Sequence, residues 1–457
     1  MSSTLITGGA VVTVDALSTV HDPGWVHIEN GRIAAVGAGD PAPGLIDAVD
    51  AVIDAKGCAV MPGMTNGHTH LFQTFLRGLA DDQPLLDWLR TCIWPAAEFI
   101  DADTIYHAAR IGLLENLLGG ATCVVDHQYV HPGLDGDVLD DAVCRAADEL
   151  GVRLLLAHGW ADRNYHDPLV EDAATAIRRT DATRQRWDGH DNGRIRVELA
   201  PLIPWGCSDD AMRDTVAAAR SWGRGTHIHC AETHVEVEMS LDERGMRHVP
   251  WLHSLGVLGP DVQLAHSVWL DDAELDLIAA SGAVVVHCPV SNMYLASGVA
   301  RVVEMRRKGI TVALASDGAG SNNRQDMFEV LKSTVLLQKV HRLDAMALQP
   351  EDALEMACAN GAAVFGTPGD FGRIQPGAAA DLLVVSLKSP FVAPVHRVPS
   401  ALVFNASPAD VVHVIVAGEH LVEHGRHRSV DTDEVVAAAE DAAQRLFQRA
   451  GIPTRLG

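Results

Sequence analysis

The sequence contains little positive charge. Its 457 residues include 35 Lys and Arg against 60 Asp and Glu, which gives a formal net charge of -25 at pH 7. A surface of this sign repels the phosphate backbone of nucleic acids and the anionic headgroups of membranes. We therefore expect no nucleic-acid or membrane partner, and a small-molecule ligand instead.

The sequence also lacks long apolar runs and a basic N-terminal segment. No apolar stretch reaches the roughly 18 residues of a membrane-spanning helix. No Lys or Arg precedes Arg32, so a signal peptide is not indicated and we expect a cytoplasmic protein. Because 47% of the residues are hydrophobic, the chain can bury a large core, as two or three ordinary domains or as one barrel with an appendage.

Paired cysteines are missing as well. The 8 cysteines are scattered singly between Cys58 and Cys358, without a Cys-x-x-Cys motif. This spacing argues against a zinc ribbon and against a disulfide framework. We interpret the thiols as small, reduced core residues.

Both ends of the chain carry short β-strand patterns. Residues 25–28 and 32–36 flank Asn30-Gly31, which is a strong signal for a tight hairpin. Similar β-branched runs return after residue 380, and we predict that the two ends form one small sheet domain. Helical spacing of apolar residues over 432–450 predicts a terminal helix.

Between these ends, apolar runs alternate with segments of helical periodicity. Eight such runs occur, at residues 60–64, 122–126, 152–157, 195–200, 226–230, 262–265, 284–288 and 311–315. Eight strand-and-helix units, with no Gly-x-Gly-x-x-Gly after the first strand, favour a closed parallel barrel over an open doubly wound sheet.

We therefore predict an α/β fold with three parts. Residues 59–374 form a TIM-like (β/α)8 barrel, residues 1–58 and 375–430 form a composite β-sandwich, and residues 431–457 form a C-terminal helix. In such a barrel, catalytic residues stand at the C-terminal ends of the strands.

Histidines and carboxylates follow the predicted barrel strands. In chain order these are His68 and His70, Asp126 and His127, His229 and Glu232, His266, His287, and Asp317. His68 and His70 share one face of an extended segment, because they are two residues apart. With His229 and Asp317 they offer three nitrogens and one oxygen, which suits Zn²⁺ or Fe²⁺ with a position left for solvent. For His227 and His287, a role as a buried core histidine is as consistent with the sequence as a functional role.

On these motifs the chain resembles the amidohydrolase superfamily, in the group of the s-triazine hydrolases and the purine-type deaminases that act on methylthioadenosine and S-adenosylhomocysteine. The matching motifs are Pro62-Gly63, His68-Thr69-His70, His229-Cys230-Ala231-Glu232, Leu264-Ala265-His266 and Ser316-Asp317-Gly318. The resemblance implies one divalent metal, held by His68, His70, His229 and Asp317, with Glu232 and His266 beside the metal-bound water. Related two-metal hydrolases need a bridging lysine, and the lack of lysine between Lys56 and Lys308 excludes that arrangement.

The predicted reaction is hydrolytic deamination of an amino-substituted aromatic N-heterocycle of the aminopurine, pterin or amino-s-triazine type. The cation would lower the pKa of its bound water to about 7. We expect Glu232 to protonate a ring nitrogen, His266 to polarise the attacking oxygen and Asp317 to accept its proton. The alternatives are an s-triazine hydrolase that expels chloride or an alkylamine, a deaminase of methylthioadenosine, S-adenosylhomocysteine or adenosine, and a catalytically inactive metal-binding barrel.

Departures from the nucleoside branch guide the substrate prediction. That branch has a glutamate where Ala97 stands, and an arginine and a histidine where His158 and Leu202 stand, so a free heterocycle is favoured. Gly318 stands where the chlorohydrolase has asparagine, which favours deamination. The candidate substrate contacts are Gln73, Trp88, His127, Gln128, Tyr129 and Asn292, although Trp88 also fits a core position and Gln73 a helix cap. We also expect a homo-oligomer, either a dimer or a tetramer.

Overall fold

The computed structural model describes residues 3–133 and 136–453, which divide into two compact units. Among the described residues, the first unit takes in 3–66, 114–123 and 326–432, and the second takes in 67–113, 124–133, 136–325 and 433–453. Strands β6 and β7 each cross this division, so the predicted domain boundaries remain a prediction.

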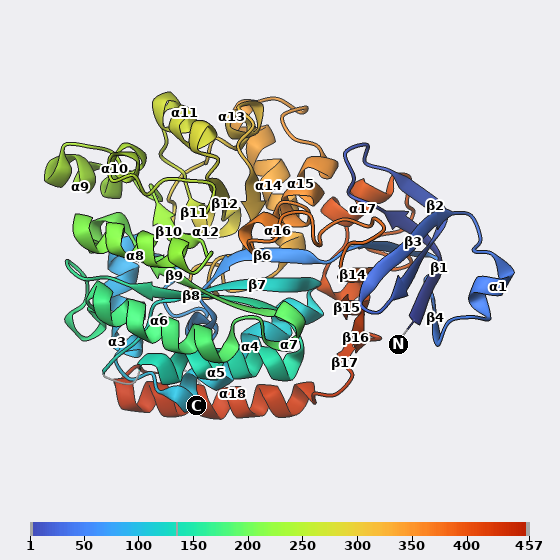
Figure 1. Ribbon diagram of the computed structural model, residues 1–457, viewed down its shortest axis with the longest axis horizontal. Helices are drawn as coiled ribbons and strands as arrows, with labels where there is room; N and C mark the ends of the chain where they lie inside the picture. The colour runs from blue at the N-terminus through green and yellow to red at the C-terminus, as the bar shows by residue number, and fades with distance from the viewer. Residues whose placement is uncertain (1–2, 134–135, 454–457) are drawn as a thin grey trace. The chain divides into compact units, whose positions relative to one another are not determined.

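The first unit contains a nine-stranded, largely antiparallel sheet built from both ends of the chain (Figure 1). Its strands are β1 Ser3–Val12, β2 Val20–Glu29, β3 Arg32–Ala38, β4 Ala51–Asp54, β5 Cys58–Pro62, β14 Leu382–Ser386, β15 Val411–Val416, β16 Glu419–Glu423 and β17 Arg426–His427. The two chain ends meet where β5 pairs antiparallel with β14. Apolar side chains from both ends share one core, including Ile28, Val60 and Leu382. The predicted sheet from both ends is confirmed.

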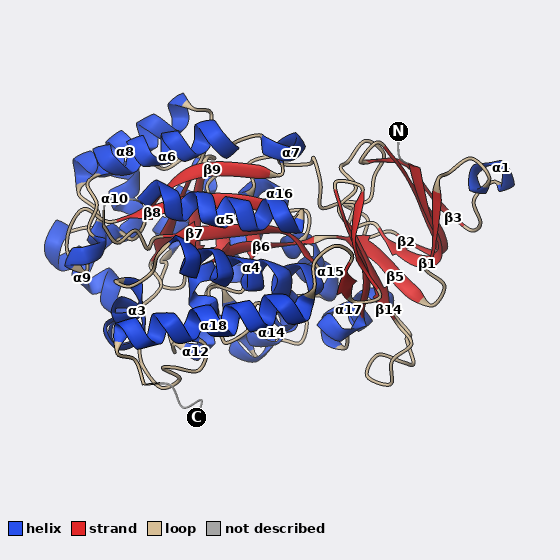
Figure 2. Cartoon of the chain, turned by 90° about the horizontal axis from the view of Figure 1, so that it is seen from below, coloured by secondary structure: helices blue, strands red, loops and turns tan. Residues whose placement is uncertain are grey.

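Eight parallel strands form a nearly closed barrel, as predicted (Figure 2). They run in chain order as β6 Met64–Thr69, β7 Ala121–Gln128, β8 Arg153–Trp160, β9 Ile195–Pro201, β10 Thr226–Cys230, β11 Val262–His266, β12 Val284–His287 and β13 Val312–Leu314. The segment after β13 returns to β6, because the Asp317 N–H donates to the carbonyl of His68 at 3.0 Å. This contact brings the first and last strand ends together.

Helices connect the strands in both units. Their bounds are α1 Pro43–Ile46, α2 Leu85–Trp88, α3 Trp94–Ala97, α4 Ala102–Leu118, α5 Gly136–Leu150, α6 Ala173–Trp187, α7 His190–Gly193, α8 Asp209–Ser221, α9 His234–Arg244, α10 His248–Ser254, α11 Asp272–Ser281, α12 Pro289–Tyr294, α13 Val302–Arg307, α14 Met327–Arg342, α15 Pro350–Ala357, α16 Gly361–Val364, α17 Val398–Phe404 and α18 Thr432–Ala450. None of the helices in the described part of the chain is long and apolar enough to cross a membrane.

Local sequence signals explain several of these elements. Asn30 and Gly31 both adopt a positive φ, of 51° and 78°, as the tight hairpin between β2 and β3 requires. Asp271 and Glu274 cap α11 reciprocally through each other's backbone N–H groups. The terminal helix α18 has the bounds that its apolar spacing predicts.

The predicted first barrel strand was placed wrongly. Of the predicted strand at residues 60–64, residues 60–62 belong to β5 of the nine-stranded sheet, and the barrel begins with β6 at Met64. Gly63 separates the two strands, and a Cβ there would overlap the side chain of Thr122. Strand β6 was predicted only as an extended segment around His68 and His70, because its buried residues are mostly polar. The amide of Asn66, for example, donates to Asn116 at 2.9 Å. Tertiary enclosure overrides the weak strand propensity of this segment.

Candidate active site and metal centre

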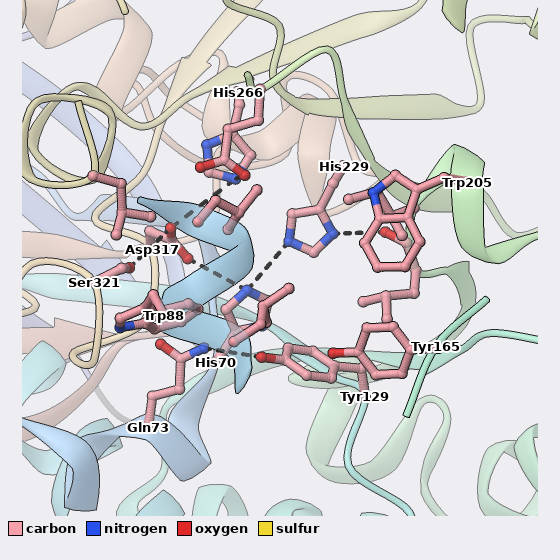
Figure 3. Close-up of a pocket in the computed structure, with 16 residues that line it drawn as sticks. His70, Gln73, Trp88, Tyr129, Tyr165, Trp205, His229, His266, Asp317 and Ser321 are labelled. Atoms are coloured by element: carbon pink, nitrogen blue, oxygen red, sulfur yellow. Dashed lines mark hydrogen bonds and ion pairs between the residues drawn. The ribbon is translucent and has the colours of Figure 1, made fainter. Parts of the chain in front are cut away.

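The ends of β6, β10 and β13 bring His68, His70, His229 and Asp317 into one buried cluster. Figure 3 shows His70, His229 and Asp317 of this cluster. The Nε2 atom of His70 lies 3.3 Å from His229 Nε2 and 3.3 Å from Asp317 Oδ1, and His68 Nε2 lies 3.5 Å from the same oxygen. Ligands about 2.0–2.1 Å from a tetrahedral metal are about 3.3–3.4 Å apart. Among the described residues, His68 Nε2 is buried with no hydrogen-bond partner. The donor set therefore fits one divalent metal ion.

Backbone carbonyls fix the tautomers of two of these histidines. His70 Nδ1 donates to the carbonyl of His127 at 2.7 Å, and His229 Nδ1 donates to the carbonyl of Leu202 at 2.6 Å. Because a carbonyl can only accept, the proton sits on Nδ1 and the Nε2 lone pair remains for a metal.

His68 is held by a chain of buried side chains instead of a carbonyl. Its Nδ1 lies 2.8 Å from His227 Nε2, and His227 Nδ1 lies 2.7 Å from Gln263 Oε1. The amide of Gln263 then donates to Glu198 at 3.3 Å. A nitrogen–nitrogen distance of 2.8 Å is that of a hydrogen bond and is shorter than the ligand spacing above. His227 therefore orients His68 and is not placed as a fourth nitrogen ligand.

Glu232 and His266 stand beside the donor cluster. His266 Nε2 lies 3.6 Å from Glu232 Oε2 and 4.0 Å from Asp317 Oδ2, and the hydroxyl of Ser297 donates to Glu232 Oε1 at 3.1 Å. Burial raises the pKa of Glu232 to about 7. For His266, burial acts to lower the pKa, but the charges of Glu232 and Asp317 outweigh it and the pKa is raised. Glu232 can therefore exchange a proton near neutral pH.

The carboxylate of Asp317 is anchored from several sides. The hydroxyls of Ser291 and Ser321 donate to Oδ2 at 2.6 and 3.0 Å, and the Gly318 N–H donates to Oδ1 at 2.6 Å. Asp317 and His266 both have a left-handed backbone, with φ of 66° and 65°. Such strained positions are typical of functional sites that the surrounding structure holds in place.

A pocket with an empty volume of about 440 Å³ opens onto these groups. Its lining residues are His70, Gln73, Leu85, Trp88, Leu89, Tyr129, Tyr165, Leu202, Ile203, Trp205, His229, Glu232, His266, Leu295, Asp317 and Ser321. Three predicted substrate contacts, Gln73, Trp88 and Tyr129, are among them. The Gln73 amide donates to the Tyr129 hydroxyl at 3.1 Å, while its buried Oε1 has no partner among the described residues and can accept a hydrogen bond. Trp88 donates to the carbonyl of Gly320 at 3.0 Å.

The other three predicted contacts do not line this pocket. His127 lies in β7 behind His229, with ring centroids 4.8 Å apart, and its carbonyl holds His70. The amide of Gln128 donates to the carbonyl of Val130 at 3.0 Å. Asn292 Oδ1 lies 2.9 Å from His266 Nδ1, so Asn292 orients that imidazole. These residues support the site from behind.

Sequence reasoning missed two aromatic residues of the pocket wall. Tyr165 lies in the loop after β8, and Trp205 lies in the short 3-10 turn after β9, with ring centroids 5.7 Å apart (Figure 3). Both follow barrel strands at the end where active sites form. Their position after a barrel strand was the one sequence signal that could have indicated that they line the pocket.

His158 does not occupy the pocket. Its Nδ1 lies 2.6 Å from Asp140, its Nε2 lies 3.0 Å from Glu171, and Asp140 also accepts from His131 at 2.9 Å. These are hydrogen-bond distances, shorter than the spacing of metal ligands, so this buried group is a charge network. Asp126, whose pKa burial raises to about 8, accepts from the Leu71 N–H and also does not line the pocket.

Residues 59–421 match the model of the amidohydrolase family. The chain belongs to this family. It is therefore a hydrolytic enzyme that acts on C–N bonds, and the sequence-based resemblance is confirmed.

Two relatives of this amidohydrolase carry deaminase names. This chain is 38% identical over 444 residues to the 5'-deoxyadenosine deaminase of Methanothermobacter thermautotrophicus, and the match covers 97% of this chain and 99% of the relative. It is 40% identical over 457 residues to the 5-methylthioadenosine/S-adenosylhomocysteine deaminase of Halobacterium salinarum, covering 99% of this chain and 100% of the relative.

Solved structures with the same fold include both enzyme types of the predicted group. An adenosine deaminase from Xanthomonas campestris with bound zinc superposes with a TM-score of 0.90 at 29% identity, over 98% of this chain and 99% of the other. The zinc complex of the atrazine chlorohydrolase from Arthrobacter aurescens TC1 gives a TM-score of 0.90 at 25% identity, over 96% and 100%.

Proposed function

We propose that this amidohydrolase is a zinc-dependent deaminase of adenosine nucleosides with an uncharged 5' end, such as 5'-deoxyadenosine or methylthioadenosine. The names of the two relatives support the nucleoside alternative over the free heterocycle that the sequence favoured. The sequence argument against a nucleoside also weakens, because His158 lies outside the pocket.

The observation that carries this proposal is the composition of the pocket wall. Trp88, Tyr129, Tyr165 and Trp205 offer aromatic faces for a purine, and leucine and isoleucine side chains offer apolar surface for a sugar with a short 5' substituent. Among the described residues that line the pocket, none is Lys or Arg. A carboxylate at the 5' end would therefore find no positive partner in this pocket.

Zinc is proposed because three imidazoles and one carboxylate are a common zinc donor set, and because the similar adenosine deaminase structure contains zinc. When bound, the cation supplies a water of lowered pKa, about 7.

Side chains of the protein then donate and accept the protons of the reaction. Glu232, with a pKa near 7, protonates the purine ring nitrogen next to the amino-bearing carbon. His266 Nδ1 donates to the amide oxygen of Asn292, so only the imidazolium form, which the charges of Glu232 and Asp317 favour, can donate a hydrogen bond from Nε2 to the attacking oxygen. Asp317 accepts the proton of the nucleophile and returns it to the departing amine, so ammonia leaves and the oxo-purine nucleoside forms.

The free oxygen of Gln73 favours a second candidate, deamination of a free aminoheterocycle. This oxygen is buried, has no partner in the described part of the chain, and can accept from an exocyclic amino group. The structural likeness to the atrazine chlorohydrolase points the same way.

A substrate panel distinguishes the candidates by ammonia release. It contains 5'-deoxyadenosine, methylthioadenosine, adenosine, S-adenosylhomocysteine, adenine, guanine, pterin and melamine. We expect the first two to have the highest kcat/KM. S-adenosylhomocysteine should fall behind by roughly 5- to 150-fold, because an unpaired polar group costs about 1–3 kcal/mol. Faster turnover of a free base or of melamine would overturn the nucleoside proposal.

A further inference from the structure

A second group of metal-ligating side chains lies on strands β15 and β16 of the nine-stranded sheet. His413 is buried, His420 is half-buried, and Glu423 and His424 are exposed to solvent. These residues belong to the first unit and have no part in the proposed reaction.

The register of the two strands places these side chains on one face. His413 lies directly opposite Glu423 in the antiparallel pair. His420 stands three residues before Glu423, an odd spacing that would turn it to the opposite face of a regular strand. A register shift between Val414 and Ile415 corrects this, and a β-bulge of this kind re-aims a side chain. His413 Nδ1 and His420 Nε2 consequently lie 3.1 Å apart.

The next residue adds a third imidazole. His424 has a left-handed backbone with φ of 53°, which turns the chain sharply after β16. Its ring centroid lies 5.5 Å from that of His413, and the centroid of His420 lies 5.1 Å from the same ring. The imidazoles of His420 and His424 and the carboxylate of Glu423 therefore gather around His413.

The donor atoms are close enough for one ion. Those of His413, His420 and Glu423 all lie within 4.8 Å of one another. The 3.1 Å between the two imidazole nitrogens is the distance of a hydrogen bond, and it has to lengthen only to about 3.3–3.4 Å for both nitrogens to bind a tetrahedral zinc. Glu423 is exposed to solvent, so rotation of its side chain can bring the carboxylate in as the third donor.

The charges around the cluster are compatible with a cation. Burial, followed by the charges of His420 and His424, lowers the pKa of His413 to about 4, and burial also lowers the pKa of His420. Both shifts favour the neutral imidazole, which is the form that binds a metal. Arg428 is the cation beside the group; its Nε lies 3.6 Å from Glu423 Oε2, so an ion would share this carboxylate with Arg428.

We propose that His413, His420, Glu423 and His424 form a second transition-metal site, separate from the catalytic centre, with zinc as the ion that best suits imidazole and carboxylate ligands. Two strands and the turn after them contribute its ligands. An ion bound there stabilises this hairpin, because it binds only the folded arrangement.

The test counts zinc per chain. The full-length protein is stripped with a chelator, dialysed against buffered micromolar zinc and measured by mass spectrometry, with deaminase turnover followed in parallel. We expect two zinc ions per chain in the wild type. His420→Gln and Glu423→Gln should each hold one and keep full turnover. His229→Asn should also hold one, with turnover lost.

A matched control is His27→Gln, which removes a buried histidine from β2 of the same sheet. This variant should retain two zinc ions. The proposal is overturned if the wild type binds one zinc, or if the His420 and Glu423 variants still bind two. Neither result depends on the proposed substrate, because the reaction is measured separately.

Discussion

Replacement of Glu232 by glutamine separates proton transfer from metal binding. Glutamine has the same heavy-atom shape, so the buried side chain keeps its place and its oxygen can still accept from Ser297. What is lost is the exchangeable proton of a carboxyl group whose pKa burial raises to about 7. A positioned general acid contributes about 10²- to 10⁴-fold, so kcat should fall by that factor, equivalent to about 2.7–5.4 kcal/mol.

Metal content decides the role of Glu232 in this variant. Glu232 is not among the four donors whose spacing fits a metal, so zinc at the catalytic centre should stay at the wild-type level. His229→Asn removes a donor and should lower both zinc and kcat. The assay is ammonia release at saturating substrate, with zinc measured on the same samples. If Glu232→Gln loses as much zinc as His229→Asn, Glu232 is a ligand and the assignment of the acid is wrong.

Three further predictions follow from the same geometry. Removal of metal by a strong chelator should abolish activity and leave most of the helical circular dichroism, because the barrel core does not depend on the ion; wholesale loss of the helix signal would contradict this. His227→Leu should weaken zinc affinity about 10- to 100-fold by releasing His68, while His227→Gln, which keeps an acceptor, should recover much of it; equal affinities in both variants would refute the orienting role. Burial raises the pKa of Glu198 to about 7 in the folded protein, above its unfolded value of about 4.5. The folded state therefore holds the proton of Glu198 more tightly than the unfolded state does. The stability that this proton contributes is fully present below pH 4.5 and is lost as the pH rises from 4.5 to 7. The stability of Glu198→Gln relative to wild type should therefore rise over that range by up to about 3 kcal/mol, measured by urea unfolding.

Local chemistry made much of the fold predictable. The Asn30-Gly31 turn, the reciprocal cap of Asp271 and Glu274, and the spacing of α18 are all set by residues close in sequence. The four proposed metal donors lie together for a related reason, since each stands at or just after the end of a parallel strand and parallel strands end at one rim.

Side-chain direction was harder to predict. Strand β8 runs to Trp160, three residues beyond the predicted end at 157, so His158 is within the strand and not at its end. A shift of one residue moves a side chain to the other face of a strand, and His158 meets Asp140 of α5 instead of the pocket. Tyr165 and Trp205 lie in loops, where no periodicity indicates direction.

The electrostatics of the donor cluster favour a bound cation. Burial, followed by the charges of neighbouring histidines, lowers the pKa of His68 and of His229 well below the usual value; burial lowers that of His70 too, although Asp317 opposes it. The three imidazoles are therefore neutral at pH 7, with their Nε2 lone pairs turned toward one carboxylate. Lone pairs facing one another without a proton repel, and the buried Nε2 of His68 has no donor among the described residues. A divalent ion would accept all of these lone pairs at once. It would displace no proton from the imidazoles, because neutral imidazole is the form that binds a metal.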